Sequence, residues 1–458
     1  MSRLYPYFTN YFVLPFYDLM RGTSRFKFSQ VLDKTQWLSR KQLEVLQTKK
    51  LRSLFKYAYE NVPYYRRIFK ERSLKPNDIK NFDDLTKFPI LTKANIRKNA
   101  ENMVSRSYPK SKLIRYQSGG SGNPIKFYIT KEKLSWEVAA EFRAYNWANY
   151  RLGDRCFMFW GSPIDRSKSQ TLIGNLTKFL ERISIADTYL MSESKMRKFV
   201  YSLEKFNPEI IKGYTTSLVM IAKYFLENKI DSINPKSVIT AAETLFDSDR
   251  KIIEEAFGCP VFDYYGSREV GAIAAECEEH NGYHIAVENV LCEFVKEGEY
   301  VSPGEKGTIL VTNLRNFGMP FIRYKIGDVG IPSEEKCSCG RGLPLLSSVQ
   351  GRISDFLAVY DKENDCVVPV GPVYPFFEIA VMHSPVESYQ VIQETVDEIL
   401  IKIVKGKGYS QKDSDLLLVK VKQLLGDTVE VKIDFVDEIP PLASGKRSRI
   451  ISKVTSLY

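Results

Sequence analysis

An alternation of short apolar runs with helical stretches, between about residues 113 and 310, constrains the fold of this sequence more than any other feature. The clearest apolar runs are Arg155 to Trp160, Ile210 to Gly213, Ser237 to Ala241 and Val261 to Tyr265. A strand-then-helix order of this kind predicts an α/β fold with a substantial parallel sheet. Residues 1 to about 110 are predicted to be mainly helical, because segments such as Leu38 to Val62 space their apolar residues by three and four.

The pattern changes after about residue 355. Strand-like segments at Leu357 to Tyr360, Ser388 to Ile392, Ile399 to Val404 and Val429 to Phe435 surround a predicted helix at Gln411 to Gly426. This arrangement predicts a compact α+β module of about 100 residues. We therefore expect a large domain over residues 1–352 and a small domain over residues 353–458.

Composition and charge exclude several classes of protein. Hydrophobic residues at 44% and charged residues at 26% are ordinary for a globular chain. No apolar run approaches the ~20 residues of a membrane span, and no signal-peptide cleavage site is evident, so a cytoplasmic location is expected. The 66 basic and 55 acidic residues give a net charge of +11. The lysines are spread along the chain, and without a zinc-finger, RRM or basic-helix pattern we expect no nucleic-acid partner.

Seven cysteines are too few for a disulfide scaffold in a chain of 458 residues, but three of them form a pattern with a histidine. The set is Cys277, His284, Cys337 and Cys339. Thiolates and imidazole suit tetrahedral Zn²⁺, and four such ligands predict a closed, structural site that staples an insertion at about residues 277–342. His280 is a competing ligand, and unligated thiols are the alternative, because C-x-C spacing is tighter than the usual C-x₂₋₄-C.

A Gly/Ser-rich loop lies between two strand-like segments in Tyr116 to Tyr128, YQSGGSGNPIKFY. Its central residues are Ser118, Gly119, Gly120, Ser121 and Gly122. Glycines let a backbone approach a ligand closely, and consecutive N–H groups can converge on phosphate oxygens. Lys126 would add charge if it turned toward such a site. The alternative is a simple hairpin turn. The GK[ST] ending of a P-loop NTPase is absent, so that class is disfavoured.

Further strings follow this loop in a fixed order: Ala242-Glu243-Thr244, Tyr264 to Gly271 (YYGSREVG), Phe321 to Asp328 (FIRYKIGD), Gly351 to Asp355 (GRISD) and Pro440 to Arg449 (PPLASGKRSR). The series resembles the adenylate-forming superfamily of acyl-CoA synthetases, luciferases and peptide-synthetase adenylation domains. GYTTS at Gly213 to Ser217, the long string from Thr312 to Gly330 and the CSCGRGLP string resemble the phenylacetate–CoA ligase and CapK-like branch most closely. The resemblance implies a large α/β domain with a small α+β lid.

The resemblance also implies ATP, Mg²⁺ and CoA as ligands and assigns roles to individual residues. The loop at 118–122 would hold the β- and γ-phosphates, and Glu269 would coordinate Mg²⁺. Lys446 would stabilise charge that develops in the adenylation transition state. The residues implied to contact the nucleotide are Ala242, Glu243, Thr244, Tyr265, Gly266, Ser267, Asp328 and Arg352. Without the resemblance, Glu269 would be interpreted as a solvated carboxylate and Lys446 as part of a basic turn.

The activity implied is the conversion of a carboxylic acid and ATP to acyl-AMP and pyrophosphate, followed by acyl transfer, with CoA as the expected acceptor. One alternative keeps the adenylation but passes the acyl group to a component of a polysaccharide pathway, as in CapK-like relatives. Another is a zinc-stabilised binding protein that has lost catalysis. The aromatic N-terminus, from Tyr5 to Tyr17, suits contact with a membrane surface, and its alternative is a helix packed on the large domain.

Overall fold

The computed structural model of the chain describes residues 4–118, 125–160, 172–188, 193–352, 357–361, 366–370, 385–425, 429–440 and 449–454. The chain divides into two compact units. The first comprises residues 1–326 and 330–349, and the second comprises residues 327–329 and 350–458. The exact boundary expected between residues 352 and 353 stays a prediction.

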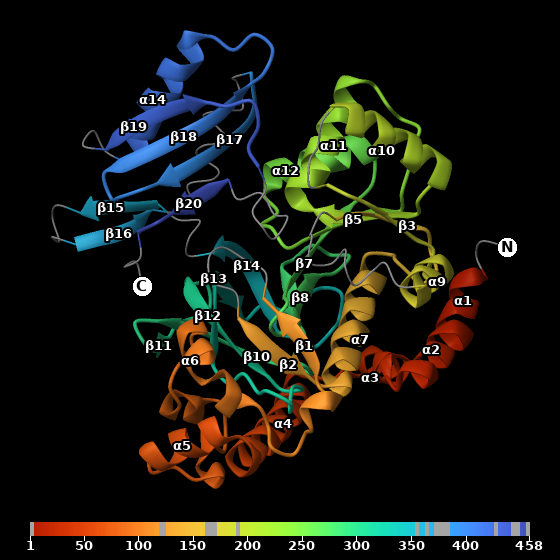
Figure 1. The fold of residues 1–458 in the computed structure, drawn as a ribbon, viewed down its shortest axis with the longest axis vertical. Coiled ribbons are helices and arrows are strands. Elements are labelled where there is room, and N and C mark those ends of the chain that lie inside the picture. Colours follow the sequence, from red (N-terminus) through yellow and green to blue (C-terminus); the bar gives the residue numbers. More distant parts are fainter. Residues whose placement is uncertain are drawn as a thin grey trace. The chain divides into compact units, whose positions relative to one another are not determined.

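Helices occupy much of the first unit (Figure 1). They are α1 (Tyr5–Phe8), the π-helical turn η1 (Thr9–Val13), α2 (Leu14–Arg21), α3 (Arg25–Thr35), α4 (Arg40–Asn61), α5 (Pro63–Glu71), the 3₁₀ turns η2 (Pro76–Asp78), η3 (Asp83–Lys87) and η4 (Lys110–Lys112), α6 (Lys93–Met103), α7 (Lys131–Trp147), α9 (Leu172–Glu181), α10 (Glu193–Phe206), α11 (Thr215–Glu227) and α12 (Asp247–Phe257).

The strands of the first unit form a two-stranded ribbon and a twelve-stranded sheet, whose strand β13 also carries residues 327–329 and whose strand β14 crosses into the second unit. The ribbon joins β1 (Ile114–Gln117) to β2 (Lys126–Ile129). The sheet contains β3 (Cys156–Phe159), β4 (Ile183–Ala186), β5 (Ile210–Tyr214), β6 (Ser237–Ala241), β7 (Val261–Ser267), β8 (Gly271–Glu276), β9 (Tyr283–Ile285), β10 (Val290–Lys296), β11 (Glu299–Tyr300), β12 (Gly307–Asn313), β13 (Tyr324–Ser333) and β14 (Leu345–Arg352).

The large sheet has a parallel part and an antiparallel part. The order β4-β3-β5-β6-β7 is parallel throughout, with helices α10, α11 and α12 in the connections. This half corresponds to the apolar runs from which an α/β fold was predicted. From β7 onward, β8 and β9 pair antiparallel, and so do β9 and β14. The region 277–342 supplies β9 to β13 of this sheet, so much of it is a continuous part of the large sheet.

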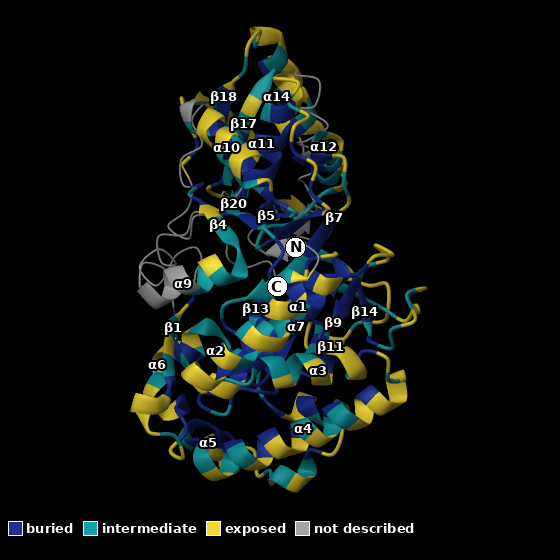
Figure 2. Cartoon of the chain, turned by 90° about the vertical axis from the view of Figure 1, so that its right-hand side faces the viewer, coloured by how far each residue is buried: buried dark blue, intermediate teal, exposed yellow. Residues whose placement is uncertain are grey.

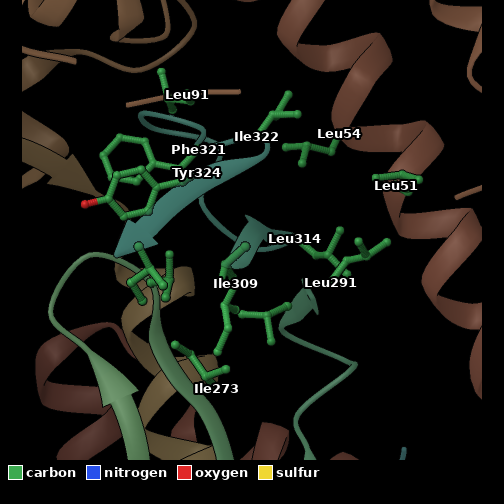
Figure 3. Packing of buried hydrophobic residues seen from close by; sticks show 14 of the residues in the cluster. Leu51, Leu54, Leu91, Ile273, Leu291, Ile309, Leu314, Phe321, Ile322 and Tyr324 are labelled. Carbon is green, nitrogen blue, oxygen red and sulfur yellow. The ribbon is translucent and has the colours of Figure 1, made fainter. Parts of the chain in front are cut away.

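The N-terminal helices cover part of the antiparallel half. α4 begins at a capping box in which Ser39 and Gln42 satisfy each other's backbone N–H groups, and Thr92 and Asn95 do the same for α6. Leu51 and Leu54 on α4 belong to the same apolar cluster as residues of β8, β10 and β12, and Figure 3 shows this packing. Burial of this cluster attaches the predicted helical segment to the sheet.

The second unit is an α+β module. Its four-stranded sheet has the order β19-β18-β17-β20, and a separate hairpin pairs β15 with β16. The elements are β15 (Leu357–Asp361), β16 (Cys366–Val370), β17 (Val386–Gln393), β18 (Glu398–Lys405), α14 (Gln411–Leu425), β19 (Glu430–Phe435) and β20 (Ile450–Ser452). The expected fold class, a large α/β domain with a small α+β domain, is confirmed. Among the described residues, no helix has both the length and the apolar character that crossing a membrane requires.

Candidate functional site

The sheet brings several of the predicted nucleotide-site strings to one edge. In the pairing of β5, β6 and β7, Tyr214 lies opposite Ala241, and Ala241 lies opposite Tyr264. The loops that follow these strands therefore begin side by side, at the carboxyl ends of parallel strands, where open α/β sheets bind ligands. The last residues of β7 and the loops at this edge contain the residues 242–244 and 265–269 predicted to form the nucleotide site.

Glu269 lies in the turn between β7 and β8, and its side chain is buried, with an exposed fraction of 6%. The Tyr324 hydroxyl donates a hydrogen bond to Glu269 Oε1 at 3.3 Å. The turn is pressed against α7, because a Cβ atom at Gly271, where φ is +87°, would lie 2.7 Å from the Glu137 side chain. Glycine is therefore required there both for its backbone conformation and for space.

The next residue of this turn, Val270, is held by the end of β12 through contacts that the sequence pattern did not reveal. Asn313 Nδ2 donates to the carbonyl of Val270 at 2.9 Å, and Asn313 Oδ1 accepts from the backbone N–H groups of Arg315 and Asn316. Asn316 in turn donates to the carbonyl of Tyr128 on β2. The string Thr312 to Asn316 thus connects the Glu269 turn to the strand that follows the Gly/Ser-rich loop.

Glu243 acts as a helix cap in this structure. Its Oε2 accepts hydrogen bonds from the Thr216 backbone N–H at 2.8 Å and the Thr216 hydroxyl at 2.7 Å, at the first turn of α11. A carboxylate there satisfies an unpaired helix donor and interacts favourably with the helix dipole. Ala242, next to it, has φ +74°, a left-handed conformation that is costly for alanine and is often found at functional sites. Thr244 follows in the same half-buried loop.

The described ends of the Gly/Ser-rich loop form the closed base of a hairpin. Ser118 Oγ accepts from the Ile125 N–H at 2.9 Å, while the Ser118 N–H donates to the Ile125 carbonyl. Lys126 is exposed on β2, opposite Gln117. Gly119, Gly120, Ser121 and Gly122 lie outside the described residues. The binding of phosphate by this loop stays a prediction.

The remaining predicted nucleotide contacts are spread over other elements. Tyr265, Gly266 and Ser267 are half-buried at the end of β7. Asp328 is half-buried on β13, and Arg352 is the last residue of β14. Lys446 lies outside the described residues. The roles of these residues stay predictions.

A half-buried lysine near the same sheet edge is a candidate that the sequence pattern did not reveal. Lys212 on β5 donates a hydrogen bond to the Tyr145 hydroxyl on α7, and its Nζ lies 5.9 Å from the ring centroids of Trp160 and Tyr264. The Tyr264 hydroxyl donates to Glu141 Oε1 at 3.3 Å. Burial lowers the pKa of Lys212 and raises the pKa of Glu141, while the charges of the two groups oppose both shifts. In the sequence this lysine lies within the apolar run Ile210 to Gly213, which has no motif that distinguishes it as a site residue.

The predicted Cys/His set does come together. Cys277 follows β8, His284 lies on β9, and Cys337 and Cys339 lie between β13 and β14. Their four ligand atoms all lie within 4.8 Å of one another. The sulfurs of Cys277 and Cys337 are 3.6 Å apart, and Cys339 Sγ is 3.3 Å from His284 Nε2. Tetrahedral zinc, with bonds of about 2.3 Å to sulfur and about 2.0–2.1 Å to nitrogen, requires ligand separations of this size.

The ionisable groups of this cluster have pKa values shifted toward their neutral forms. Burial raises the pKa of the Cys277 and Cys337 thiols and lowers the pKa of His284 to about 4. A neutral imidazole is the form that binds metal, whereas the thiols would lose their protons on coordination. His280 takes no part in the cluster, because its Nδ1 lies 3.5 Å from Glu276 Oε2 and its ring packs on Phe262.

The loop that carries Cys337 and Cys339 is packed directly on the segment before α4. The Gly342 N–H donates to the Gln36 carbonyl at 2.9 Å, and Arg341 Nε donates to Gln36 Oε1 at 3.1 Å. A Cβ atom at Gly342 would lie 1.9 Å from the Leu38 carbonyl oxygen, so glycine is required at this contact. The cluster therefore joins the N-terminal helices to the large sheet.

Comparisons with known proteins agree with this arrangement. A family model described as the CapK C-terminal domain matches residues 375–453. Protein CapK of Staphylococcus aureus is 27% identical over 418 residues, which cover 89% of this chain and 89% of CapK. Phenylacetate-coenzyme A ligase of Thermus thermophilus is 25% identical over 440 residues, which cover 90% of this chain and 97% of that enzyme.

The fold has a solved counterpart in 2-hydroxyisobutyryl-CoA ligase. Its crystal structure in the postadenylation state superposes with a TM-score of 0.73 at 20% identity and covers 92% of both chains. This likeness concerns the fold, whereas the relationship to CapK and the phenylacetate–CoA ligases comes from sequence. The sequence relationship and the likeness of the fold confirm the resemblance to the adenylate-forming superfamily, and to its phenylacetate–CoA ligase and CapK branch, that was expected from the motifs.

Proposed function

We propose that the chain converts a carboxylic acid and ATP to an acyl-adenylate and pyrophosphate, and then transfers the acyl group to CoA. In the first step a carboxylate oxygen attacks the α-phosphorus of ATP, and the bond to pyrophosphate breaks. In the second step the CoA sulfur attacks the acyl carbon, and AMP leaves. The proposal rests on relatives that span nearly the whole chain and on the environment of Glu269.

The burial of the Glu269 carboxylate is the observation that carries the proposal. Within the described part of the chain, a tyrosine hydroxyl hydrogen-bonds to this carboxylate and no basic side chain pairs with it. Buried charges in proteins are normally paired or coordinate a metal. Carboxylate oxygens are preferred ligands of Mg²⁺, so the residue fits the ion that an ATP-dependent reaction requires. Bound Mg²⁺ would neutralise charge on the phosphates.

Other residues of the chain would bind the nucleotide and stabilise the transition state. We propose that the 118–122 loop binds the terminal phosphates, that Asp328 accepts hydrogen bonds from the ribose hydroxyls, and that Arg352 approaches the nucleotide. Residues 242–244 and 265–267 would enclose the adenine, with Glu243 also holding the start of α11. Lys446 would stabilise negative charge on both reacting groups in the transition state.

The acid would bind beside the aromatic residues at the ends of β3 and β5. Trp160 and Tyr214 stack there with ring centroids 4.3 Å apart, and Lys212 lies 5.9 Å from the Trp160 ring. Aromatic walls suit an aryl or medium-sized apolar acid. Because Lys212 adds a half-buried hydrogen-bond donor, we propose that the acid also carries a polar substituent that reaches it.

We also propose that the Cys/His cluster binds one structural Zn²⁺. Four soft ligands at tetrahedral separations would close the coordination shell and leave no position for substrate. The metal would contribute to the stability of the fold and take no part in the reaction.

A second acyl acceptor is favoured by one observation. The family model that matches the second unit is that of CapK, and CapK itself matches 89% of this chain. We therefore propose, as the alternative to CoA, transfer to an amine or hydroxyl of a surface-polysaccharide precursor. Both acceptors would use the same acyl-adenylate.

A screen of carboxylic acids for acid-dependent pyrophosphate release tests the activity. Lys446→Ala should lower this release by roughly 10²-fold or more, the scale for losing one preorganised charge, with little change in ATP binding. Lys407→Ala, at an exposed lysine of the second unit, is the matched control and should have no effect. Near-normal release by Lys446→Ala would contradict the assignment. Single-turnover formation of acyl-CoA from preformed acyl-AMP distinguishes CoA from the polysaccharide acceptor.

A further inference from the structure

The N-terminal helix of the first unit leaves a broad apolar face exposed. α1, η1 and α2 follow one another without a break from Tyr5 to Arg21, a length of roughly 25 Å at about 1.5 Å per residue. The apolar side chains on the outside are Leu4, Tyr7, Phe8, Tyr11, Phe12, Phe16, Leu19 and Met20, with exposed fractions from 50% to 80%. We refer to these residues as the N-terminal apolar face. Monomeric proteins rarely expose a contiguous apolar patch of this kind without a partner.

The opposite side of the same helix is fixed to the protein. Thr9 is fully buried, and a Cβ atom at Gly153 would lie 2.6 Å from its hydroxyl oxygen. The Tyr5 hydroxyl donates to the Leu180 carbonyl on α9 at 2.9 Å. α9 contacts η1, and its Phe179 is 76% exposed. The apolar face is therefore presented outward by a docked helix, and Figure 2 shows exposed residues along α2.

The exposed charges around this face are mainly positive. Asp18 is the one acidic residue among the first 32 of the sequence, and it is buried in an ion pair with Arg25 at 2.9 Å. The exposed basic residues on and around this segment are Arg21 on α2, Lys27 on α3, Lys131 at the start of α7 and Arg151. Glu132, next to Lys131, is an exposed acid at this border, so the basic residues outnumber the acidic ones. An apolar stripe bordered by cations, without exposed acids on its own segment, is complementary to a surface that is apolar inside and negatively charged outside.

We propose that the N-terminal apolar face binds the surface of an anionic lipid bilayer. Tyrosine and phenylalanine rings partition into the boundary between headgroups and acyl chains, and basic side chains beside them attract anionic headgroups. The helix would lie in the plane of the interface, with its buried side toward the protein. The inference is independent of the proposed reaction.

Vesicle flotation with the full-length protein tests the inference. Vesicles of phosphatidylcholine alone are compared with vesicles that contain about one third phosphatidylglycerol. We expect binding to the anionic vesicles that weakens with added salt, as screened electrostatic attraction requires. The triple variant Phe12→Ser, Phe16→Ser, Leu19→Gln should bind at least about tenfold less. Its matched control is Val45→Ser with Tyr201→Ser, which removes two equally exposed apolar side chains from α4 and α10.

The outcomes separate the possible occupants of the face. The double variant Arg21→Gln, Lys27→Gln keeps the apolar face intact and should lower binding to anionic vesicles severalfold. This variant tests the inference even if the triple variant folds poorly. Equal binding by the triple variant and the wild type would overturn it, and so would no binding to either kind of vesicle. Self-association of the wild type in sedimentation, lost in the triple variant and without lipid binding, would assign the face to a second copy of the chain.

Discussion

The two ends of strand β8 carry different sets of potential metal ligands. Before its first residue, Gly271, the turn presents the single buried carboxylate of Glu269. After its last residue, Glu276, the chain continues into Cys277 and the set of four soft ligand atoms within 4.8 Å of one another. One carboxylate leaves most positions of a bound ion open to water and phosphate oxygens, whereas four thiol and imidazole ligands fill the shell. We therefore expect the first end to govern the reaction rate and the second to govern stability.

The largest expected effect is on the reaction at the first end. Glu269→Gln keeps the size of the side chain and its contact with Tyr324 but removes the charge, so pyrophosphate release should fall by about 10²-fold or more. The melting temperature should stay near that of the wild type, because no ion pair within the described residues is broken. Glu255→Gln, at an exposed position on α12, is the control. An unchanged rate would show that Glu269 has no role in the reaction. The expected difference in function between the two ends of β8 would then be wrong.

The next largest expected effect is on the stability of the fold at the second end of β8, where the Cys/His cluster lies. Purified protein should contain about one Zn²⁺ per chain, and Cys339→Ser should lose the metal and several kcal/mol of unfolding free energy, because binding energy at a structural zinc site is folding energy. The rate of adenylation by protein that is still folded should change little. Cys259→Ser and His280→Ala should leave the zinc content as it is. Metal analysis that finds no zinc in reduced protein would refute the site.

A smaller expected effect is a pH dependence of the unfolding free energy that arises near the second end of β8. Asp263 on β7 is buried beside Glu276, and burial together with that second carboxylate raises the pKa of Asp263 to about 7, although hydrogen bonds from Thr240 and Tyr283 oppose the shift. The folded protein thus holds the proton more tightly than the unfolded chain, whose Asp pKa is about 3.9. The resulting stabilisation is fully present below about pH 4 and is lost as the pH rises to about 7.

Unfolding free energies measured between pH 4 and pH 7 check this expectation. The wild type should lose a few kcal/mol over this range relative to Asp263→Asn, whose side chain does not titrate. Asp247→Asn, at an exposed aspartate, should follow the wild type. If Asp263→Asn showed the same pH dependence as the wild type, the buried acid would not be the group responsible.

Local sequence patterns were sufficient to predict several strands and to select four Cys/His side chains that lie together in the structure. The segment predicted at Ser237 to Ala241 is β6 with the same bounds, and the helix expected to start at Gln411 is α14 (Gln411–Leu425). His284 was included in the predicted set with His280 as a competing ligand, and the structure places His284 with the three cysteines and His280 beside Glu276. These features depend on residues close together in the chain or on a distinctive set of side-chain types.

Contacts between segments that are distant in the chain could not be predicted from the sequence. β8 is buried along its whole length, so its apolar pattern does not distinguish parallel from antiparallel pairing, and the antiparallel half of the sheet was not foreseen. The hydrogen bond from Asn313 to the Val270 carbonyl joins positions 43 residues apart. The capping of α11 by Glu243 depends likewise on how two strand ends lie next to each other, which no pattern in either string reveals.

The contact between Gln36 and Gly342 has a consequence for how the protein is made. The segment before α4 has its backbone partner about 300 residues later in the chain. At typical synthesis rates of about 5–20 residues per second, the N-terminal helices wait roughly 15–60 s on the ribosome before that partner emerges. Their sheet-facing leucines, such as Leu51 and Leu54, are exposed to the cell during this interval, which makes the nascent chain a client for chaperones that bind apolar segments.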